Sequence, residues 1–229
     1  MKLPDITDIF FDLDHTLWDF DRNSRTAFDR VFLKHNLQVH VSDFISVYEP
    51  INLEYWKLFR EERVSKQDLR RGRLIDAFAK LDLSFQLNEI DAMAVSYIDE
   101  LPVDNHLFDG AQEMLAYLKP KYKLHIITNG FREVQHVKLN NSGIRSYFET
   151  VTTSEEVGVK KPNVLVFQSA LEKANTRAQS SIMIGDSLEA DIEGAANAGM
   201  RALFYNYRNE DVKGRYPSIQ QLSEIKNYL

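Results

Sequence analysis

One stretch near the N-terminus, residues 8–16, most constrains the fold of this chain. Its apolar run, 9–11, ends abruptly in two acids, Asp12 and Asp14, with Thr16 two residues further on. An unbroken apolar run of this length is typical of a strand buried on both faces of a sheet. Because side chains alternate along an extended chain, Asp12 and Asp14 point to the same side. Their repulsion suggests a hard cation such as Mg²⁺ beside them, although the solvated end of a strand has the same pattern.

The composition narrows the class of protein. With 229 residues and 44% hydrophobic content, the chain is long enough for a sizeable core. A formal net charge of −6 argues against a nucleic-acid polymer as the main partner. The absence of cysteine excludes disulfides and thiolate chemistry. The first residues lack the apolar run of a signal peptide and no later stretch could span a bilayer, so we expect a cytoplasmic protein without a membrane partner.

Helical periodicity dominates residues 17–105. Apolar residues recur there at helical spacing and predict four helices in succession. The predicted helices begin near Ser24, Ser42, Ser65 and Asn88. Four helices with no strand between them do not fit within a single doubly wound sheet. We therefore predict that 17–105 is an inserted helical domain and that 1–16 and 106–229 together form the core domain.

Strands and helices alternate after this insertion. The predicted strands are 123–128, 148–153, 181–186 and 201–205. Pro162 is expected to be the first residue of one helix, and Ser218 is expected to begin the last helix. Strands separated by helices imply a parallel sheet, in which ligands bind beyond the carboxyl ends of the strands. The predicted fold class is α/β, with a Rossmann-like parallel sheet as the core.

Polar side chains stand at the carboxyl ends of the predicted strands. They are Asp12 and Asp14 after the first strand, Thr128 and Asn129 at the second, and Asp186 at the fourth. Lys161 lies at a predicted helix start on the same rim, and Gly130 offers a backbone N–H there. Carboxylates around a cation, a hydroxyl, a lysine and free N–H groups form a cradle for a phosphoryl group. Phosphoryl transfer also needs an in-line nucleophile and a proton donor, which two acids can supply.

Four short motifs occur in a fixed order along the chain. They read Asp-Leu-Asp-His-Thr at 12–16, Ile-Thr-Asn-Gly at 127–130, Lys-Lys-Pro at 160–162 and Gly-Asp-Ser-Leu-Glu-Ala-Asp at 185–191. In this order they resemble the motifs of the haloacid dehalogenase superfamily of phosphohydrolases. The helical insertion between the first two motifs is similar to that superfamily's C1 cap, so the resemblance covers the whole chain. The residues at 14–20, 126–131 and 157–162 resemble the pyrimidine 5'-nucleotidase branch.

The resemblance implies a role for each catalytic residue. Asp12 would attack phosphorus and carry an aspartyl-phosphate. Asp14 would protonate the leaving alcohol and then deprotonate the hydrolytic water. Thr128 and Lys161 would hold the transferring phosphoryl oxygens, with the backbone of 129–130 nearby.

The resemblance also implies a magnesium site. Mg²⁺ would be bound by Asp12, by the backbone carbonyl of Asp14 and by Asp186, with Asp191 nearby. On general grounds Asp14 also suits the role of acid, because a carboxyl turned away from the ion beside a metal-bound carboxylate can hold a proton. Thr16 is expected to orient the loop rather than to touch the substrate.

Substrate selection is expected to depend on the cap. Trp18 lies just after the nucleophile, where its ring could stack on a base, so we expect it to face the substrate. The sequence leaves open whether Arg70, Arg71 and Arg73 are exposed charges or reach the substrate.

The leading hypothesis is a Mg²⁺-dependent phosphomonoesterase acting on nucleoside 5'-monophosphates, pyrimidine nucleotides first, as a monomer or homodimer. A phosphatase of sugar phosphates or other small esters is the nearest alternative. A phosphomutase fits less well, and a dehalogenase less well again, because its chemistry does not need Asp14. A signalling receiver domain also gathers Asp, Thr and Lys around Mg²⁺, but its motif order differs and it has no helical insertion of this size.

Overall fold

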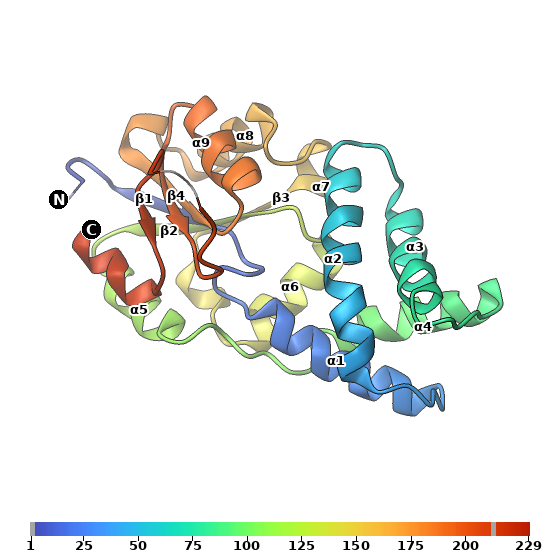
Figure 1. Ribbon diagram of the computed structural model, residues 1–229. Helices are drawn as coiled ribbons and strands as arrows, with labels where there is room; N and C mark the ends of the chain where they lie inside the picture. The colour runs from blue at the N-terminus through green and yellow to red at the C-terminus, as the bar shows by residue number, and fades with distance from the viewer. Residues whose placement is uncertain (1–2, 212–213) are drawn as a thin grey trace. The chain divides into compact units, whose positions relative to one another are not determined.

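Two compact units make up the chain. The computed structural model describes residues 3–211 and 214–229 (Figure 1). The core unit comprises 1–20 and 105–229, and the helical unit comprises 21–104. The sequence-based boundary at residue 17 lies earlier than this division, because the segment around Trp18 pairs with the core unit. The Leu17 carbonyl accepts from the Phe108 N–H at 2.9 Å, and the Asp19 N–H donates to the His106 carbonyl at 3.0 Å.

A parallel six-stranded sheet forms the centre of the core unit. Its strands are β1 (Asp8–Phe11), β2 (Lys123–Thr128), β3 (Thr150–Thr153), β4 (Ser181–Gly185), β5 (Arg201–Tyr205) and β6 (Ser218–Ile219). Their order across the sheet is β3-β2-β1-β4-β5-β6, and every neighbouring pair is parallel. The predicted α/β fold with a parallel sheet is therefore confirmed.

Strand β1 lies between β2 and β4 because its residues suit complete burial. Ile9, Phe10 and Phe11 have no exposed surface. The register places Phe11 beside Ile126 of β2 and Ile184 of β4. The residues that follow β1, β2 and β4 consequently lie together beyond the carboxyl ends of these strands.

Helices cover both faces of the sheet in the core unit. The longer ones are α5 (Ala111–Leu118), α6 (Arg132–Asn141) and α8 (Val164–Ala174); short turns are α7 (Ser154–Val157), α9 (Gly194–Asn197), η1 (Arg145–Tyr147), η2 (Ala178–Ser180), η3 (Leu188–Glu193) and η4 (Leu222–Asn227). Figure 1 shows α8 and α9 on one face and α5 and α6 on the other. Phe10, Phe167 and Met183 belong to the buried apolar cluster beneath α8 and α9.

Two predicted helix starts in the core unit are wrong, and the first predicted helix begins at Phe20, before the expected Ser24. Helix α8 begins at Val164 behind Asn163, whose side chain accepts from the Leu165 N–H, so Pro162 precedes the helix. Ser218 begins the edge strand β6 rather than a helix. The Asn206 N–H donates to the Ile219 carbonyl at 2.7 Å, and this pairing draws the segment into the sheet.

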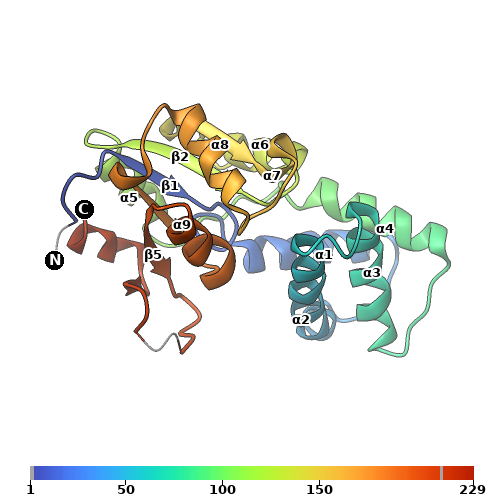
Figure 2. The ribbon, with the colours of Figure 1, turned by 90° about the horizontal axis from the view of Figure 1, so that it is seen from above.

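The helical unit is an aromatic-rich bundle. Its helices are α1 (Phe20–Lys34), α2 (Val41–Arg60), α3 (Lys66–Ala79) and α4 (Leu87–Glu100). Figure 2 shows α2 and α3 side by side. Phe28 of α1 stacks on Tyr97 of α4 with 4.3 Å between ring centroids, and it meets Tyr48 of α2 edge-on at 4.7 Å. Ser65 and Asp68 form a capping box at the start of α3, as their spacing suggests.

Two of the arginines left open by the sequence have partners inside the helical unit. Arg71 pairs with Asp91, with Nη2 at 2.6 Å from Oδ2. Arg73 is buried, donates from Nη1 to Asn52 Oδ1 at 2.9 Å and lies over the ring of Tyr97. Across the described residues, no helix is both long enough and apolar enough to cross a membrane.

Candidate active site

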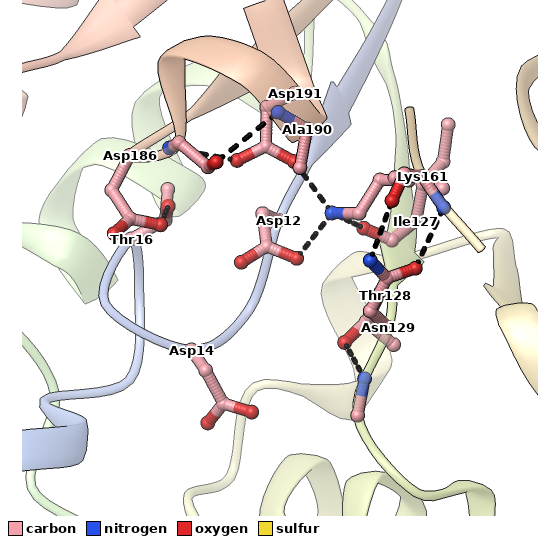
Figure 3. Close-up of polar contacts among 12 residues, drawn as sticks. Asp12, Asp14, Thr16, Ile127, Thr128, Asn129, Lys161, Asp186, Ala190 and Asp191 are labelled. Atoms are coloured by element: carbon pink, nitrogen blue, oxygen red, sulfur yellow. Dashed lines mark hydrogen bonds and ion pairs between the residues drawn. The ribbon is translucent and has the colours of Figure 1, made fainter. Parts of the chain in front are cut away.

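Polar side chains of the core unit converge beyond the carboxyl ends of β1, β2 and β4 (Figure 3). They are Asp12, Thr16, Thr128, Asn129, Lys161, Asp186 and Asp191. Asp12 directly follows β1, Thr128 ends β2 and Asp186 directly follows β4. The parallel register therefore brings together residues that lie far apart in the sequence.

Three carboxylates form the acidic part of the site. One oxygen from each of Asp12, Asp186 and Asp191 lies within 4.8 Å of the others. Desolvation by burial raises the pKa of Asp12 to about 7. The Lys161 ammonium acts to lower this pKa, but desolvation and the nearby Asp191 charge together outweigh it. Desolvation also raises the pKa of Asp186 well above its usual value, with further contributions from Asp191 and Asp12. A cation beside these buried carboxylates would favour their charged forms.

Lys161 places an ammonium group against two of these carboxylates. Its ammonium donates to Asp12 Oδ1 and Asp191 Oδ1, both at 2.6 Å, and to the Ile127 carbonyl at 2.8 Å. The side chain is only 2% exposed. Burial acts to lower the pKa of Lys161, but the two carboxylates raise it above the ordinary value. The ammonium therefore stays charged and offsets part of the negative charge.

Asn129 fixes the backbone of Lys161 through its side chain. Its Nδ2 donates to the Lys161 carbonyl at 3.0 Å, and its Oδ1 accepts from the Lys161 N–H at 2.8 Å. The sequence-based prediction assigned a role only to the backbone of Asn129, near the transferring phosphoryl group. The side-chain contact explains how the loop after β2 and the segment before α8 hold the lysine in place.

Asp191 is held in one orientation by donors to both of its carboxylate oxygens. Its Oδ1 accepts from Lys161, and its Oδ2 accepts from the Ser187 N–H at 3.0 Å. A Cβ at position 185 would lie 2.3 Å from Asp191 Oδ2, so only glycine fits at the end of β4. Thr16 donates to Asp186 Oδ1 at 3.5 Å. This contact orients a carboxylate of the cluster.

Asp14 lies apart from the three clustered carboxylates. Figure 3 shows its side chain directed away from Asp12. Its oxygens instead accept from Lys138 Nζ at 2.5 Å and from Gln135 Nε2 at 3.0 Å, two side chains of α6. Sequence reasoning missed both residues. Their spacing of three along a helix that follows the Thr128 motif is the signal that could have found them.

Thr128 is buried, and its hydroxyl is already engaged. The hydroxyl accepts from the Gly130 N–H at 3.0 Å and donates to Gln135 Oε1 at 3.3 Å. The turn after β2 thus joins the hydroxyl to helix α6. The hydroxyl has a single hydrogen, so it could donate to another acceptor only by turning away from Gln135 Oε1.

Trp18 is fully buried in the core unit. Its Nε1 donates to Asn105 Oδ1 at 3.3 Å, and the ammonium of Lys138 lies 3.8 Å from the centroid of its ring. The expected contact between Trp18 and a base stays a prediction, since the contacts found here are internal.

The arrangement combines the parts that a phosphoryl-transfer site needs. A buried carboxylate, Asp12, stands beside a fixed ammonium and two further acids that could hold a hard cation. A fourth acid, Asp14, lies on the same loop with its own donors. Carboxyl groups are among the side chains that can act as nucleophiles or transfer protons in such reactions.

Comparison with known proteins gives this arrangement a family context. The family model described as haloacid dehalogenase-like hydrolase matches residues 9–205. The chain is 36% identical to the pyrimidine 5'-nucleotidase YjjG of Escherichia coli over 228 residues, which cover 96% of each protein. It is 31% identical to the glyceraldehyde 3-phosphate phosphatase of Methanothermobacter thermautotrophicus over 200 residues, 86% of this chain and 84% of that protein. Among solved structures, the magnesium-bound crystal structure of YfnB from Bacillus subtilis superimposes with a TM-score of 0.88 at 26% identity, covering 97% of both chains.

Proposed function

Because the chain belongs to the haloacid dehalogenase-like hydrolase family, we propose that it is a Mg²⁺-dependent phosphomonoesterase that hydrolyses nucleoside 5'-monophosphates, with pyrimidine nucleotides preferred. The observation that carries this proposal is the buried Asp12 carboxylate beside Lys161, at the edge of the sheet where Asp186 and Asp191 also lie. The 36% identity to a pyrimidine 5'-nucleotidase over nearly the whole chain supports the substrate class.

In the first proposed step, Asp12 is the nucleophile. Lys161 holds Oδ1 of Asp12, so the other carboxylate oxygen is the one that attacks phosphorus. As the new oxygen–phosphorus bond forms, the bond to the ester oxygen breaks and its electron pair stays on that oxygen. Asp14 gives its proton to the leaving oxygen, and an alcohol departs. Lys161 holds the phosphoryl oxygens during the transfer together with Thr128, whose O–H turns from Gln135 Oε1 to do so, and the backbone of 129–130 lies nearby.

The second proposed step releases phosphate. Asp14, now a carboxylate, takes a proton from a water molecule. The water oxygen attacks phosphorus, and the bond between phosphorus and Asp12 breaks, which restores the Asp12 carboxylate and the proton on Asp14. Asp14 thus gives one proton to the alcohol and regains one from water in each turnover, and neither acid is consumed.

The acidic cluster fits a hard divalent cation. Its carboxylate oxygens approach within 4.8 Å of one another, and burial, together with the charges of Asp191 and Asp12, raises the pKa of Asp186. Asp12, Asp186 and the carbonyl of Asp14 would hold the ion, with Asp191 beside it. When bound, Mg²⁺ neutralises charge on the phosphoryl oxygens.

A phosphate-release screen over nucleoside monophosphates and sugar phosphates tests the proposal. We expect the highest kcat/KM with pyrimidine 5'-monophosphates, complete loss of activity in a chelator and recovery when Mg²⁺ is returned. Asp12→Asn is the control for contaminating phosphatase, because it removes the nucleophile while preserving shape. Activity that resists the chelator, or that survives in Asp12→Asn, would count against the mechanism.

The same screen decides between the alternatives. The relationship to a glyceraldehyde 3-phosphate phosphatase favours a sugar phosphate as the second candidate substrate. A higher kcat/KM for sugar phosphates than for nucleotides would select it. Phosphate retained on Asp12 without catalytic release of alcohol would instead indicate a phospho-accepting signalling domain.

A further inference from the structure

Helix α6 directs two buried polar side chains at Asp14. Lys138 donates to Oδ1 at 2.5 Å and Gln135 donates to Oδ2 at 3.0 Å. Each of the two donors is only 1% exposed. Because each oxygen of Asp14 has its own donor, the carboxylate cannot rotate without breaking at least one of these contacts.

Gln135 is fixed in turn by the loop after β2. Its Oε1 accepts from the Thr128 hydroxyl at 3.3 Å, which itself accepts from the Gly130 N–H at 3.0 Å. A Cβ at position 130 would lie 2.1 Å from Gln135 Nε2, so the glycine leaves the room that the amide occupies. Gln135 therefore connects the hydroxyl proposed to hold the phosphoryl group with the carboxylate proposed to move the proton.

Lys138 is held by aromatic rings as well as by Asp14. Its ammonium lies 3.8 Å from the centroid of the Trp18 ring and 5.1 Å from that of Phe20. The rings attract the charge. A buried ion pair adds little net stability, since desolvation offsets the attraction. Stability alone therefore does not account for an ammonium at this position.

We infer that Gln135 and Lys138 are positioning residues that aim the Asp14 carboxyl group at the leaving oxygen, an inference that rests on the proposed function. The clustered carboxylates do not place Asp14, whose side chain is directed away from Asp12 (Figure 3). A carboxylate has about four lone-pair sites, so two donors leave room for the transferred proton. As Asp14 gives up its proton, the charge that develops on its oxygens faces both donors.

This role depends on the leaving group. An alcohol such as a nucleoside needs a proton as its bond to phosphorus breaks, whereas p-nitrophenolate departs as a stable anion. Disturbing the aim of Asp14 should slow the first substrate and spare the second. A general loss of structure would slow both.

Single-turnover measurements with uridine 5'-monophosphate and p-nitrophenyl phosphate, both with saturating Mg²⁺, test the inference. The variants are Lys138→Met and Gln135→Leu, which keep much of the side-chain volume, and Lys138→Arg, which restores a charged donor. We expect the first-turnover release of uridine to fall ~10- to 100-fold in the first two variants, while release of p-nitrophenol changes less than about threefold. Lys138→Arg should recover part of the loss.

Lys121→Met is the matched control. Lys121 also lies over an aromatic ring, 3.5 Å from the centroid of Tyr117. It precedes β2, however, and so lies at the amino ends of the strands, opposite the candidate site. Its removal should leave both release rates unchanged. Thermal unfolding of each variant checks the fold, and Gln135→Leu carries the test if Lys138→Met does not fold.

The outcomes separate this inference from the proposed function. Equal losses with both substrates, or no loss with uridine 5'-monophosphate, would overturn the positioning role while leaving the phosphatase intact. If the unaltered protein prefers another alkyl phosphate, that ester replaces uridine 5'-monophosphate. An unaltered protein without activity on any alkyl ester would overturn the proposed function and this inference together.

Discussion

Asp12 and Lys161 share a buried hydrogen bond, and each group changes the proton affinity of the other. The ammonium of Lys161 is satisfied by three acceptors and stays charged because Asp12 and Asp191 surround it. Three carboxylates lie in the cluster, and besides Lys161 the charge of Arg208 acts on Asp186. The side chains thus leave the site short of positive charge.

The pKa of Asp12 makes metal binding dependent on pH. Without an ion, desolvation raises this pKa to about 7. Because the folded state binds this proton more tightly than the unfolded state, the proton stabilises the fold. The stabilisation is complete below about pH 4, the pKa in the unfolded chain, and it is lost as the pH rises through about 7. We therefore expect the free energy of unfolding of the metal-free protein to fall across this range. The affinity for Mg²⁺ should rise over the same range, because the ion displaces the proton.

Calorimetric titration with Mg²⁺ in two buffers of different ionisation enthalpy counts the protons released. More protons should be released at about pH 6 than at about pH 8. In Asp12→Asn the difference should shrink, because an amide has no proton to give. A Mg²⁺ affinity that does not change with pH would contradict this prediction.

At the scale of elements, the end of strand β4 shapes the acidic cluster. Gly185 is its last residue, and a Cβ there would lie 2.3 Å from Asp191 Oδ2. Gly185→Ala should displace Asp191 from Lys161 and Ser187. We expect a loss of about 1–3 kcal/mol in the free energy of unfolding, as for other overpacked sites, together with weaker Mg²⁺ binding.

Gly110→Ala is the matched control for this substitution. Gly110 precedes α5 with a φ of 78°, and a Cβ there meets no atom within 4 Å. Its replacement should cost about 1 kcal/mol of stability through backbone strain alone. Urea unfolding and Mg²⁺ titration separate the two effects. Similar Mg²⁺ affinities for the two variants would show that the close approach at β4 is unimportant.

The central strands could be predicted from sequence because their burial leaves a local signal. The apolar run before Asp12 and the one before Asp186 each mark a strand in which every position is buried. The strand beginning at Ser218 leaves no such signal, since only two residues pair and one of them is exposed. Its place depends on a hydrogen bond to Asn206, which only the folded chain provides.

The polar residues of α6 show why the candidate site could be predicted only in part. Asp12 and Lys161 belong to short motifs, whereas Gln135 and Lys138 look like ordinary polar positions of an amphipathic helix. Their burial follows from how α6 packs beside the loop of Asp14. Tertiary packing is what turns a polar helix position into a contact of the site.

At the scale of the whole molecule, each unit has a hydrophobic core of its own. Phe10 belongs to the core cluster of the sheet, and Phe28 stacks within the aromatic bundle of the helical unit. We expect a protein in which a short linker replaces 21–104 to fold and bind Mg²⁺. Its unfolding should remain cooperative, because the sheet and its helices keep their contacts.

Thermal unfolding with and without Mg²⁺ tests this expectation. At a concentration about 100-fold above the dissociation constant, the ion should stabilise the shortened and the full-length protein alike, by about 2.7 kcal/mol. Asp186→Asn in the shortened protein should reduce the stabilisation. Aggregation of the shortened protein, or no response to Mg²⁺, would show that the core unit depends on the insertion.

The paired backbone at 17–19 and 106–108 has an evolutionary consequence. The outgoing and returning chains hydrogen-bond to each other there, so the two ends of the insertion are already joined on the core side. Any segment whose ends lie close together could be exchanged at this junction without stretching the sheet. The residues at the carboxyl ends of the strands could then stay the same during evolution, while different inserted segments select different substrates.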